Sequence, residues 1–331
     1  MFRAKIAGMG HCMPDQVITN HDLAKMMETS DEWIRERTGI VERRWVKEDE
    51  NNVDLAEKAS LRAIDQAQLK PEDIDFIVFA TLSPEYYFPG TGCLLQDRLN
   101  LPTIGALDVR NQCSGFIYGL AVADQFVKTG MYKNILLVGS EVQSRGIDKS
   151  TKGRDVAVIF GDGAGAAIIS RSDDEKKGII TSQLHAEGKY AKELWGEDPG
   201  SVKEPRISHE IVDSESIWPY MNGKQVFKNA VTRFPQVILE ALQAAGLDKN
   251  EVDLVIPHQA NQRITDAVRM RLELKEEQVY SNITKYGNTT AASIPIALSE
   301  AIEEGRVKDG SLVCLAAFGS GFTWAASLVR F

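Results

Sequence analysis

The sequence predicts an α/β fold built from two similar halves, and two internal repeats carry that prediction. Residues 61–75 read as a helix end, a turn and the start of a strand, and the same pattern returns without a gap at residues 239–253. A second pair relates the apolar segment 133–140 to segment 310–317. Chance similarity between two ordinary helix–strand units is the alternative. Because both pairs keep the same order along the chain, we favour an internal duplication.

The first elements begin the layering of strand and helix that is typical of an α/β protein. Residues 1–14 predict a strand and not a signal peptide, because Arg3, Lys5 and His11 interrupt the apolar residues. Residues 76–80 (Phe-Ile-Val-Phe-Ala) predict a buried strand after the first copy of the repeat.

The middle of the chain predicts a strand–helix unit and then an antiparallel pair. Residues 103–109 form an apolar strand, and residues 115–128 form a mostly apolar helix that we expect to be buried. Residues 156–160 and 164–170 predict two antiparallel strands that close the first half.

A polar stretch at residues 171–177 marks the boundary that we expect between the halves, which then comprise residues 1–172 and 173–331. Farther along, residues 186–219 are rich in glycine, proline and charge. An irregular segment of this length is usually functional, so we expect a lid or a pocket wall there.

The composition excludes several classes of protein. Of the 331 residues, 43% are hydrophobic and 26% are charged, which supports a packed core and argues against disorder. The formal net charge of -9 argues against nucleic-acid binding. No apolar run approaches the ~20 residues that span a bilayer, so we expect no membrane segment. The four cysteines lack metal-ligand spacing, and we expect free thiols, no metal and a cytoplasmic location.

Three uncommon clusters place a cysteine, a histidine and an asparagine near the ends of predicted strands. Cys113 stands where a buried strand is expected to turn into a helix, His258 ends an apolar strand, and Asn288 lies in Gly-Asn-Thr-Thr-Ala-Ala-Ser. A helix N-terminus lowers the pKa of a thiol and favours the thiolate. A facing histidine and asparagine can donate hydrogen bonds to an enolate oxygen. The combination predicts covalent acyl transfer followed by attack of a carbanion.

Each of the three residues alone also has a structural explanation: Cys113 as a small buried hydrophobe, His258 as a core histidine and Asn288 as a helix N-cap. The repeat makes Cys113 and Asn288 near counterparts that open helices in their halves, so pseudo-symmetry should bring the three together. Segment 318–322 (Phe-Gly-Ser-Gly-Phe) offers backbone N–H groups for an oxyanion hole, with a tight turn as the alternative. Segment 161–165 is glycine-rich but precedes a strand, which argues against dinucleotide binding.

Five ordered blocks carry a family resemblance, and they are residues 29–39, 111–115, 160–166, 258–261 and 286–293. On these blocks the chain resembles the β-ketoacyl-acyl-carrier-protein synthase III family of the thiolase-like superfamily over essentially its whole length. The resemblance implies a five-layered α-β-α-β-α duplication, usually a homodimer. It also implies an acyltransferase without a cofactor, which joins acyl-CoA to malonyl-acyl-carrier protein by decarboxylative Claisen condensation and gives a 3-oxoacyl product in fatty acid biosynthesis.

The resemblance assigns a role to each site residue. Cys113 takes the acyl group, and His258 and Asn288 hold the malonyl thioester carbonyl while carbon dioxide leaves. The N–H groups of Cys113 and Ser320 hold the oxyanion, although the family usually has glycine where Ser320 stands. The expected CoA contacts are Trp33, Arg37, Arg154 and Asn261.

The expected CoA contacts include a pair on one helix. Trp33 and Arg37 are four residues apart and share a helical face, and a surface cation–π pair is the alternative. The turn-rich segment with Tyr86, Tyr87 and Phe88 predicts the acyl pocket. By resemblance Phe88 comes from the partner subunit, and packing of the dimer interface is the alternative.

A local basic patch is expected to bind the acidic carrier protein, although the net charge of the whole chain is negative. Arg263 and Arg271 are eight residues apart on a predicted helix and lie along one stripe, and Lys224 and Lys228 form another pair. The resemblance places Lys228 and Arg263 near the tunnel mouth. Such a patch would steer the carrier protein electrostatically, and a solvated helical face is the alternative.

Two departures from the family pattern leave the substrate open. Asn111 and Gln112 before the cysteine are bulkier and more polar than the small residues common in the initiating enzymes of the family. Segment 186–219 is also longer than the corresponding segment of the shortest family members. Relatives with similar features make quinolone precursors, long-chain ketones or other acyl esters. A condensing or acyl-transfer enzyme of secondary metabolism with the same triad is therefore the alternative. A non-catalytic partner subunit is disfavoured because Cys113 is present.

Overall fold

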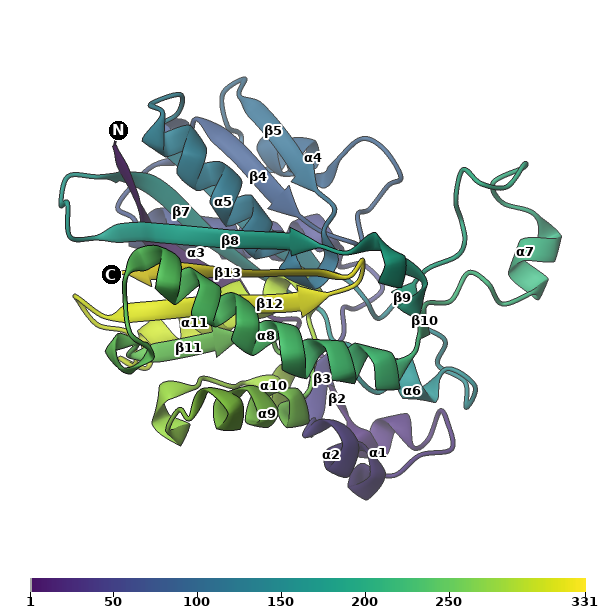
Figure 1. Cartoon of the computed structure of the whole chain (residues 1–331). Helices are drawn as coiled ribbons and strands as arrows, with labels where there is room; N and C mark the ends of the chain where they lie inside the picture. Colours follow the sequence, from purple (N-terminus) through teal and green to yellow (C-terminus); the bar gives the residue numbers. More distant parts are fainter. Residues whose placement is uncertain (1) are drawn as a thin grey trace.

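Two β-sheets form the framework of the computed structural model, which describes residues 2–331 (Figure 1). The first sheet has the strand order β1-β7-β6-β4-β5 and comprises β1 (Arg3–Cys12), β4 (Phe76–Ala80), β5 (Gly105–Val109), β6 (Asn134–Glu141) and β7 (Gly163–Ser172). The second sheet has the order β11-β12-β13-β8 and comprises β8 (Gly178–Ala186), β11 (Leu254–Pro257), β12 (Leu312–Gly319) and β13 (Thr323–Arg330). The first sheet thus ends at Ser172 and the second begins at Gly178. The exact boundary at residues 172 and 173 stays a prediction.

The two sheets share one topology, which confirms the duplicated fold. Strand β6 pairs in parallel with β4 and antiparallel with β7, and β12 pairs in the same two ways with β11 and β13. Beyond β4 the first sheet adds the parallel strand β5, and beyond β11 a single parallel bridge joins Val255 to Val279. The repeat at residues 61–75 and 239–253 therefore marks equivalent parts of two similar halves.

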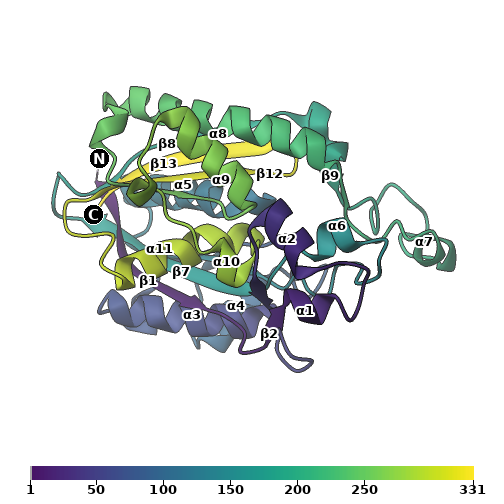
Figure 2. The ribbon, with the colours of Figure 1, turned by 90° about the horizontal axis from the view of Figure 1, so that it is seen from below.

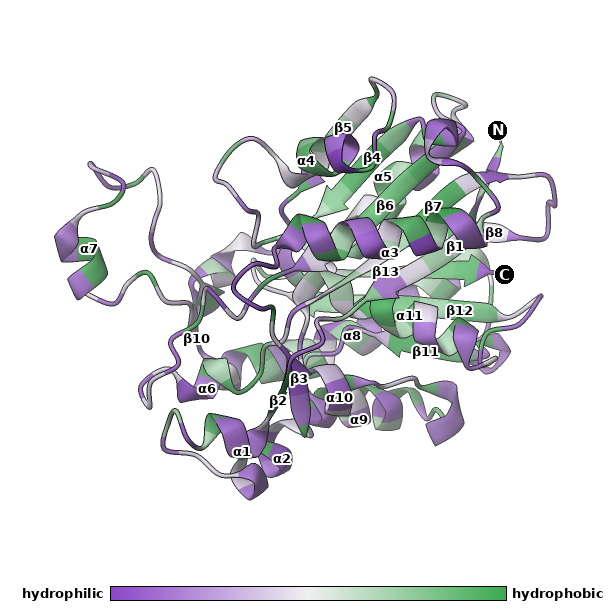
Figure 3. Ribbon diagram, turned by 180° about the vertical axis from the view of Figure 1, so that it is seen from behind, coloured by the Kyte–Doolittle hydropathy of each residue, from purple (hydrophilic) through white to green (hydrophobic). Residues whose placement is uncertain are grey.

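Helices and sheets alternate in five layers (Figure 2). The middle layer consists of α5 (Gly115–Lys128) and α11 (Ser293–Glu303), whose buried residues share one core with strands of both sheets. The outer layers are α3 (Asn52–Gln66) with α4 (Thr91–Arg98), and α8 (Gly223–Ala245) with α9 (Gln262–Leu272). Strands β4, β6 and β12 are strongly hydrophobic because helices cover both of their faces (Figure 3).

The remaining elements surround one end of the sheets. A smaller core holds β2 (Val17–Thr19), α1 (Asn20–Leu23), α2 (Asp31–Thr38), β3 (Glu42–Arg44), α6 (Arg154–Ala157) and α10 (Ile283–Tyr286). Short 3₁₀ turns are η1 (Pro71–Asp73), η2 (Gln112–Ser114), η4 (Lys249–Glu251), η5 (Glu276–Gln278) and η6 (Thr290–Ala292). The irregular segment 186–219 holds η3 (Gly188–Glu193), β9 (Leu194–Trp195) and α7 (His209–Asp213), and β10 (Tyr220–Met221) follows it. The α7 part of this segment projects from the body as an arm (Figure 1).

Two local expectations are wrong. Residues 156–160 are no strand, because the chain there leaves α6 and buries Val158 and Ile159 in the smaller core. Strand β7 pairs instead with β1 and β6. Strand β5, expected to be buried, is half exposed because it is an edge strand that pairs only with β4. Across residues 2–331, no helix is long and apolar enough to cross a membrane.

Candidate active site

Cys113 lies in a tight backbone turn that leads into the middle layer. The turn is η2, and its first residue, Gln112, has a left-handed φ of 45°. The chain then continues as α5, so the thiol stands beside the helix N-terminus. The same turn occurs in the second half, where Thr290 has a φ of 50° and α11 follows. The counterpart of Cys113 is therefore Ala291, and Asn288 precedes that turn instead of opening the helix.

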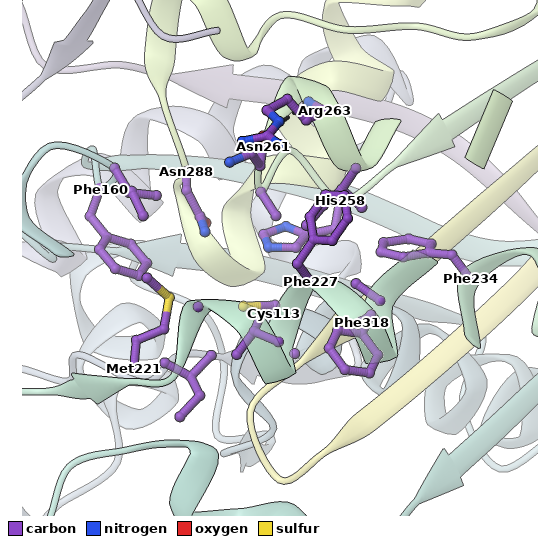
Figure 4. Close-up of a pocket in the computed structure, with 18 of the residues that line it drawn as sticks. Cys113, Phe160, Met221, Phe227, Phe234, His258, Asn261, Arg263, Asn288 and Phe318 are labelled. Atoms are coloured by element: carbon purple, nitrogen blue, oxygen red, sulfur yellow. Dashed lines mark hydrogen bonds between the residues drawn. The ribbon is translucent and has the colours of Figure 1, made fainter. Parts of the chain in front are cut away.

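One cavity of about 370 Å³ brings the three predicted residues together (Figure 4). Cys113, His258 and Asn288 all line it, and Figure 4 shows their side chains around a common space. The apolar part of the wall includes Leu194, Met221, Phe227, Phe234, Ile264 and Phe318. Such a lining excludes water from a reacting centre, which strengthens the few polar interactions inside it.

Burial controls the protonation of Cys113. The side chain is almost fully buried, and this burial raises the pKa of the Cys113 thiol to about 12, with the nearby Glu141 carboxylate acting in the same direction. The backbone N–H groups of Cys113 and Ser320 lower the pKa, but by less. The sequence argument expected a lowered pKa from the helix terminus alone. The free site therefore holds a neutral thiol, because desolvation opposes charge more strongly than two N–H groups favour it.

Segment 318–322, where an oxyanion hole is expected, packs directly against Cys113. Gly319 packs against Cys113 so closely that a Cβ there would lie 2.7 Å from the Cys113 Cβ and 3.1 Å from its Sγ. The Ser320 N–H points at the sulfur, and its hydroxyl donates to the backbone carbonyl of Leu194 at the base of the arm. Two N–H groups at one sulfur can hold the negative oxygen of a tetrahedral intermediate.

His258 is a neutral hydrogen-bonding group. It directly follows β11, and its backbone N–H donates to the Ala316 carbonyl of β12 at 2.8 Å. The side chain is buried, which lowers the pKa of His258 to about 3. Nδ1 lies 2.6 Å from the Ser293 hydroxyl, and Nε2 has no partner among residues 2–331. A buried nitrogen without a partner in a cavity wall is available to a ligand.

The backbone around Asn288 sets the direction of its amide. Its N–H donates to the Ile159 carbonyl at 2.9 Å and its carbonyl accepts from Gly161 at 3.0 Å, so the loop is fixed to the smaller core. Its side-chain Oδ1 accepts from the backbone N–H of Thr290 at 2.8 Å. Because the oxygen is already occupied, the Nδ2 group is left to donate into the cavity.

The four expected CoA contacts lie together at one side of the cavity. The Arg37 and Arg154 guanidinium groups lie 4.4 Å and 4.9 Å from the centre of the Trp33 ring. Asn261 lines the cavity, and its Nδ2 donates to the Arg37 carbonyl at 2.9 Å. A flat ring with cationic groups beside it can stack on a nucleotide base, and the Asn261 amide links this cluster to the cavity.

The acyl-pocket residues are not brought to the cavity within one chain. The Tyr86, Tyr87 and Phe88 side chains are exposed, Phe88 by 76%, and none of them lines the cavity. Tyr87 instead contacts the Arg206 guanidinium of the arm at 4.2 Å from its ring centre. The assignment of these rings to the acyl pocket stays a prediction.

The basic patch lies on two neighbouring outer helices. Lys228 on α8 and Arg263 and Arg271 on α9 are exposed. Arg263 also lines the cavity mouth and lies over the Phe227 ring, 5.6 Å from its centre. Arg271 donates to the Val231 carbonyl of α8 at 2.9 Å, which partly fixes its position.

Sequence reasoning missed the apolar wall and the residues that hold the polar groups in place. Phe227 and Phe234 are seven apart on α8, and that spacing on one helical face could have identified them. Ser293 lay inside a family block but received no role. Nothing in the sequence alone pairs it with His258, because 35 residues separate them.

Comparisons with known proteins agree with this geometry. Residues 107–188 match the model of 3-oxoacyl-[acyl-carrier-protein (ACP)] synthase III, and residues 242–331 match its C-terminal model. The chain is 46% identical to the beta-ketoacyl-[acyl-carrier-protein] synthase III of Caldanaerobacter subterraneus subsp. tengcongensis, covering 99% of this chain and 97% of the relative. It is also 46% identical to that of Alkalilimnicola ehrlichii, with both chains fully covered.

Solved structures show the same fold. The 3-oxoacyl-[acyl-carrier-protein] synthase III from Aquifex aeolicus superposes with a TM-score of 0.91 at 44% identity, covering 99% of this chain and all of that one. The priming beta-ketosynthase of the R1128 polyketide pathway superposes with a TM-score of 0.90 at 30% identity, covering 99% of this chain and 96% of that one. The fold and site define an acyl-transferring condensing enzyme with the thiolase-like fold. The chain belongs to the β-ketoacyl-[acyl-carrier-protein] synthase III family.

Proposed function

We propose that the protein catalyses the decarboxylative condensation of an acyl-CoA with malonyl-acyl-carrier protein, giving a 3-oxoacyl product that initiates fatty acid biosynthesis. One observation carries the proposal: a single buried cavity joins the Cys113 thiol to His258 and Asn288, two neutral donors. This set of groups suits a reaction that forms an acyl-thioester and then an enolate. The reaction needs no cofactor beyond its thioester substrates.

The first half-reaction transfers the acyl group. The Cys113 sulfur attacks the thioester carbonyl, the carbon–sulfur bond to CoA breaks, and the thiol proton leaves with the CoA thiolate. The N–H groups of Cys113 and Ser320 hold the negative oxygen while the intermediate exists. Because burial raises the pKa of the thiol, loss of its proton is expected as the thioester enters and not before.

The second half-reaction forms the carbon–carbon bond. The bond between the malonyl α-carbon and its carboxylate breaks, carbon dioxide leaves, and the electron pair remains as an enolate. His258 Nε2 and Asn288 Nδ2 donate to the enolate oxygen. The α-carbon then attacks the acyl carbonyl, the carbon–sulfur bond to Cys113 breaks, and the released thiolate takes a proton from solvent.

Mass spectrometry and carbon dioxide release test this division of labour. Cys113 should be the only cysteine acylated by acyl-CoA, and Cys113→Ser should lose almost all turnover. His258→Ala and Asn288→Ala should each lower malonyl decarboxylation by ~10²–10³ and affect self-acylation less, since one lost donor has that effect. An adduct on Cys12, Cys93 or Cys314, or equal damage to both half-reactions, would contradict the proposal.

We further propose that CoA binds at the Trp33 cluster and that the carrier protein docks on the patch of Lys228, Arg263 and Arg271. Exposed cations beside the cavity mouth suit an acidic partner, and their attraction falls as salt rises. Reversing Arg263 and Arg271 to Glu should raise KM for the carrier-linked malonyl donor and leave acylation by acyl-CoA nearly intact. Equal loss of CoA-dependent acylation would instead assign the patch to the CoA tunnel.

We also propose a homodimer in the cytoplasm. Strand β5 has a free edge and exposes Leu107, and the exposed Phe88 lies in the loop that precedes α4. A second copy could cover both and bring Phe88 of one subunit to the other subunit's acyl pocket. The four cysteines are free thiols, which suits a reducing compartment. Sedimentation of the purified protein tests the dimer, and a monomer at micromolar concentration would contradict it.

A further inference from the structure

The Ser293 hydroxyl faces the catalytic histidine on the side away from the cavity. Ser293 is the first residue of α11 and is 2% exposed, and its Oγ lies 2.6 Å from His258 Nδ1. The backbone N–H of Gln259 also reaches this oxygen, at 3.4 Å. Within residues 2–331 the hydroxyl has no other hydrogen-bond partner.

A neutral imidazole carries its proton on only one nitrogen, so the direction of this contact matters. If the Ser293 hydroxyl donates to Nδ1, its oxygen accepts from Gln259 and every group is satisfied. Nε2 then carries the proton and can donate into the cavity. If Nδ1 donates to Ser293 instead, the hydroxyl hydrogen is buried without an acceptor. Nε2 then carries no proton and presents only its lone pair to the cavity. A buried donor without a partner disfavours the second arrangement by about 5- to 150-fold.

The helix supports the same assignment. The N-terminus of α11, an 11-residue helix, carries partial positive charge beside Nδ1, which disfavours a proton there and disfavours the imidazolium. Burial also keeps His258 neutral. Burial therefore leaves a neutral ring, and of its two tautomers the helix terminus favours the one that presents an N–H to the cavity.

We propose that Ser293 is a positioning residue that fixes His258 in the Nε2–H tautomer by donating its hydroxyl proton to Nδ1. This inference deepens the proposed function, because only that tautomer can donate to the enolate oxygen of a malonyl thioester. Ser293 itself touches no reacting atom. Its contribution is to decide whether His258 acts as a donor or as a base.

Nitrogen NMR of the full-length protein tests the tautomer directly, without any substrate. In ¹⁵N-histidine-labelled protein, His258 should show a pyrrole-like Nε2 and a pyridine-like Nδ1, and its signals are assigned by their loss in His258→Ala. A pyridine-like Nε2 would overturn the proposal. The tautomer can be measured whether or not the protein decarboxylates malonyl thioesters. Absence of carbon dioxide release would contradict the proposed function but would leave the tautomer assignment unaffected.

Kinetics of matched variants provide the second test. Ser293→Ala should lower kcat for malonyl decarboxylation by about 5- to 150-fold with little change in KM, and should leave self-acylation of Cys113 close to wild type. Ser293→Thr keeps the hydroxyl and should restore most of the rate. The control is Ser299→Ala on the same helix, which removes a similar contact, 2.9 Å long, to Nδ1 of His11. The positioning role would be refuted if Ser293→Ala decarboxylated malonyl thioesters as fast as Ser299→Ala and its His258 spectrum were the same as in the wild type.

Discussion

A methyl group added at Gly319 should disable the oxyanion hole by pushing this segment away from Cys113, although the Cys113 thiol itself is retained. The added Cβ would lie 2.7 Å from the Cys113 Cβ, whereas ordinary van der Waals contact begins at 3.4 Å, so the two segments must separate by about 0.7 Å (3.4 − 2.7). Because oxyanion donors must lie roughly 2.7–3.1 Å from the oxygen, such a shift removes the Ser320 N–H from the developing charge. Losing one such donor lowers the rate by ~10²–10³.

The assay for Gly319→Ala is the rate at which intact protein gains an acyl group from acyl-CoA, followed by mass spectrometry. Overpacking should also destabilise the fold by about 1–3 kcal/mol, so thermal melting must show that the variant is folded at the assay temperature. Gly188→Ala is the matched control, because a Cβ there meets nothing within 4 Å. If folded Gly319→Ala acylates as fast as Gly188→Ala, the close approach of these backbones has no role in catalysis.

Three further outcomes follow from the described geometry. Because burial raises the pKa of Cys113 to about 12, its thiolate fraction grows throughout the neutral range, so alkylation by iodoacetamide should rise roughly tenfold per pH unit from about pH 6 to 9. A plateau below pH 9 in peptide-resolved mass spectrometry would show that the helix terminus outweighs burial. Trp33→Ala should raise KM for acyl-CoA by roughly 5- to 30-fold with little change in kcat, and an unchanged KM would exclude the ring from the CoA site. Phe88→Ala should extend the range of accepted acyl chains in a dimer that persists, and an identical acyl-CoA profile would reject its pocket role.

The sequence predicted the framework well because the signals were long or repeated. The helix at 115–128 matches α5. The repeat at 61–75 and 239–253 matches two helix ends and turns that lead into the equivalent strands β4 and β11. The strand at 156–160 failed because a short apolar run can fill any core, and only the tertiary structure decides whether it does so as strand or loop.

The site was predictable in its residue types but not in its electrostatics. Cys113, His258 and Asn288 stood out by local context, and they line one cavity. The pKa of Cys113 depends on how completely the other half of the chain covers it, which no local pattern encodes. The direction of the Asn288 amide likewise depends on the backbone conformation of Thr290, a residue for which a left-handed φ is uncommon.

The left-handed turn that occurs twice in this chain shows what a duplication can reuse. In the first half it carries the Cys113 thiol, and in the second half Ala291, which has no reactive side chain, occupies the equivalent place. The second turn nevertheless keeps its shape, and its Thr290 N–H holds the Asn288 oxygen. One inherited backbone shape thus serves two unlike purposes, placing a sulfur in the cavity wall in one copy and aiming an amide in the other. The two copies share the path of the main chain. They differ in the side chain that this path positions, which is Cys113 in the first half and Asn288 in the second.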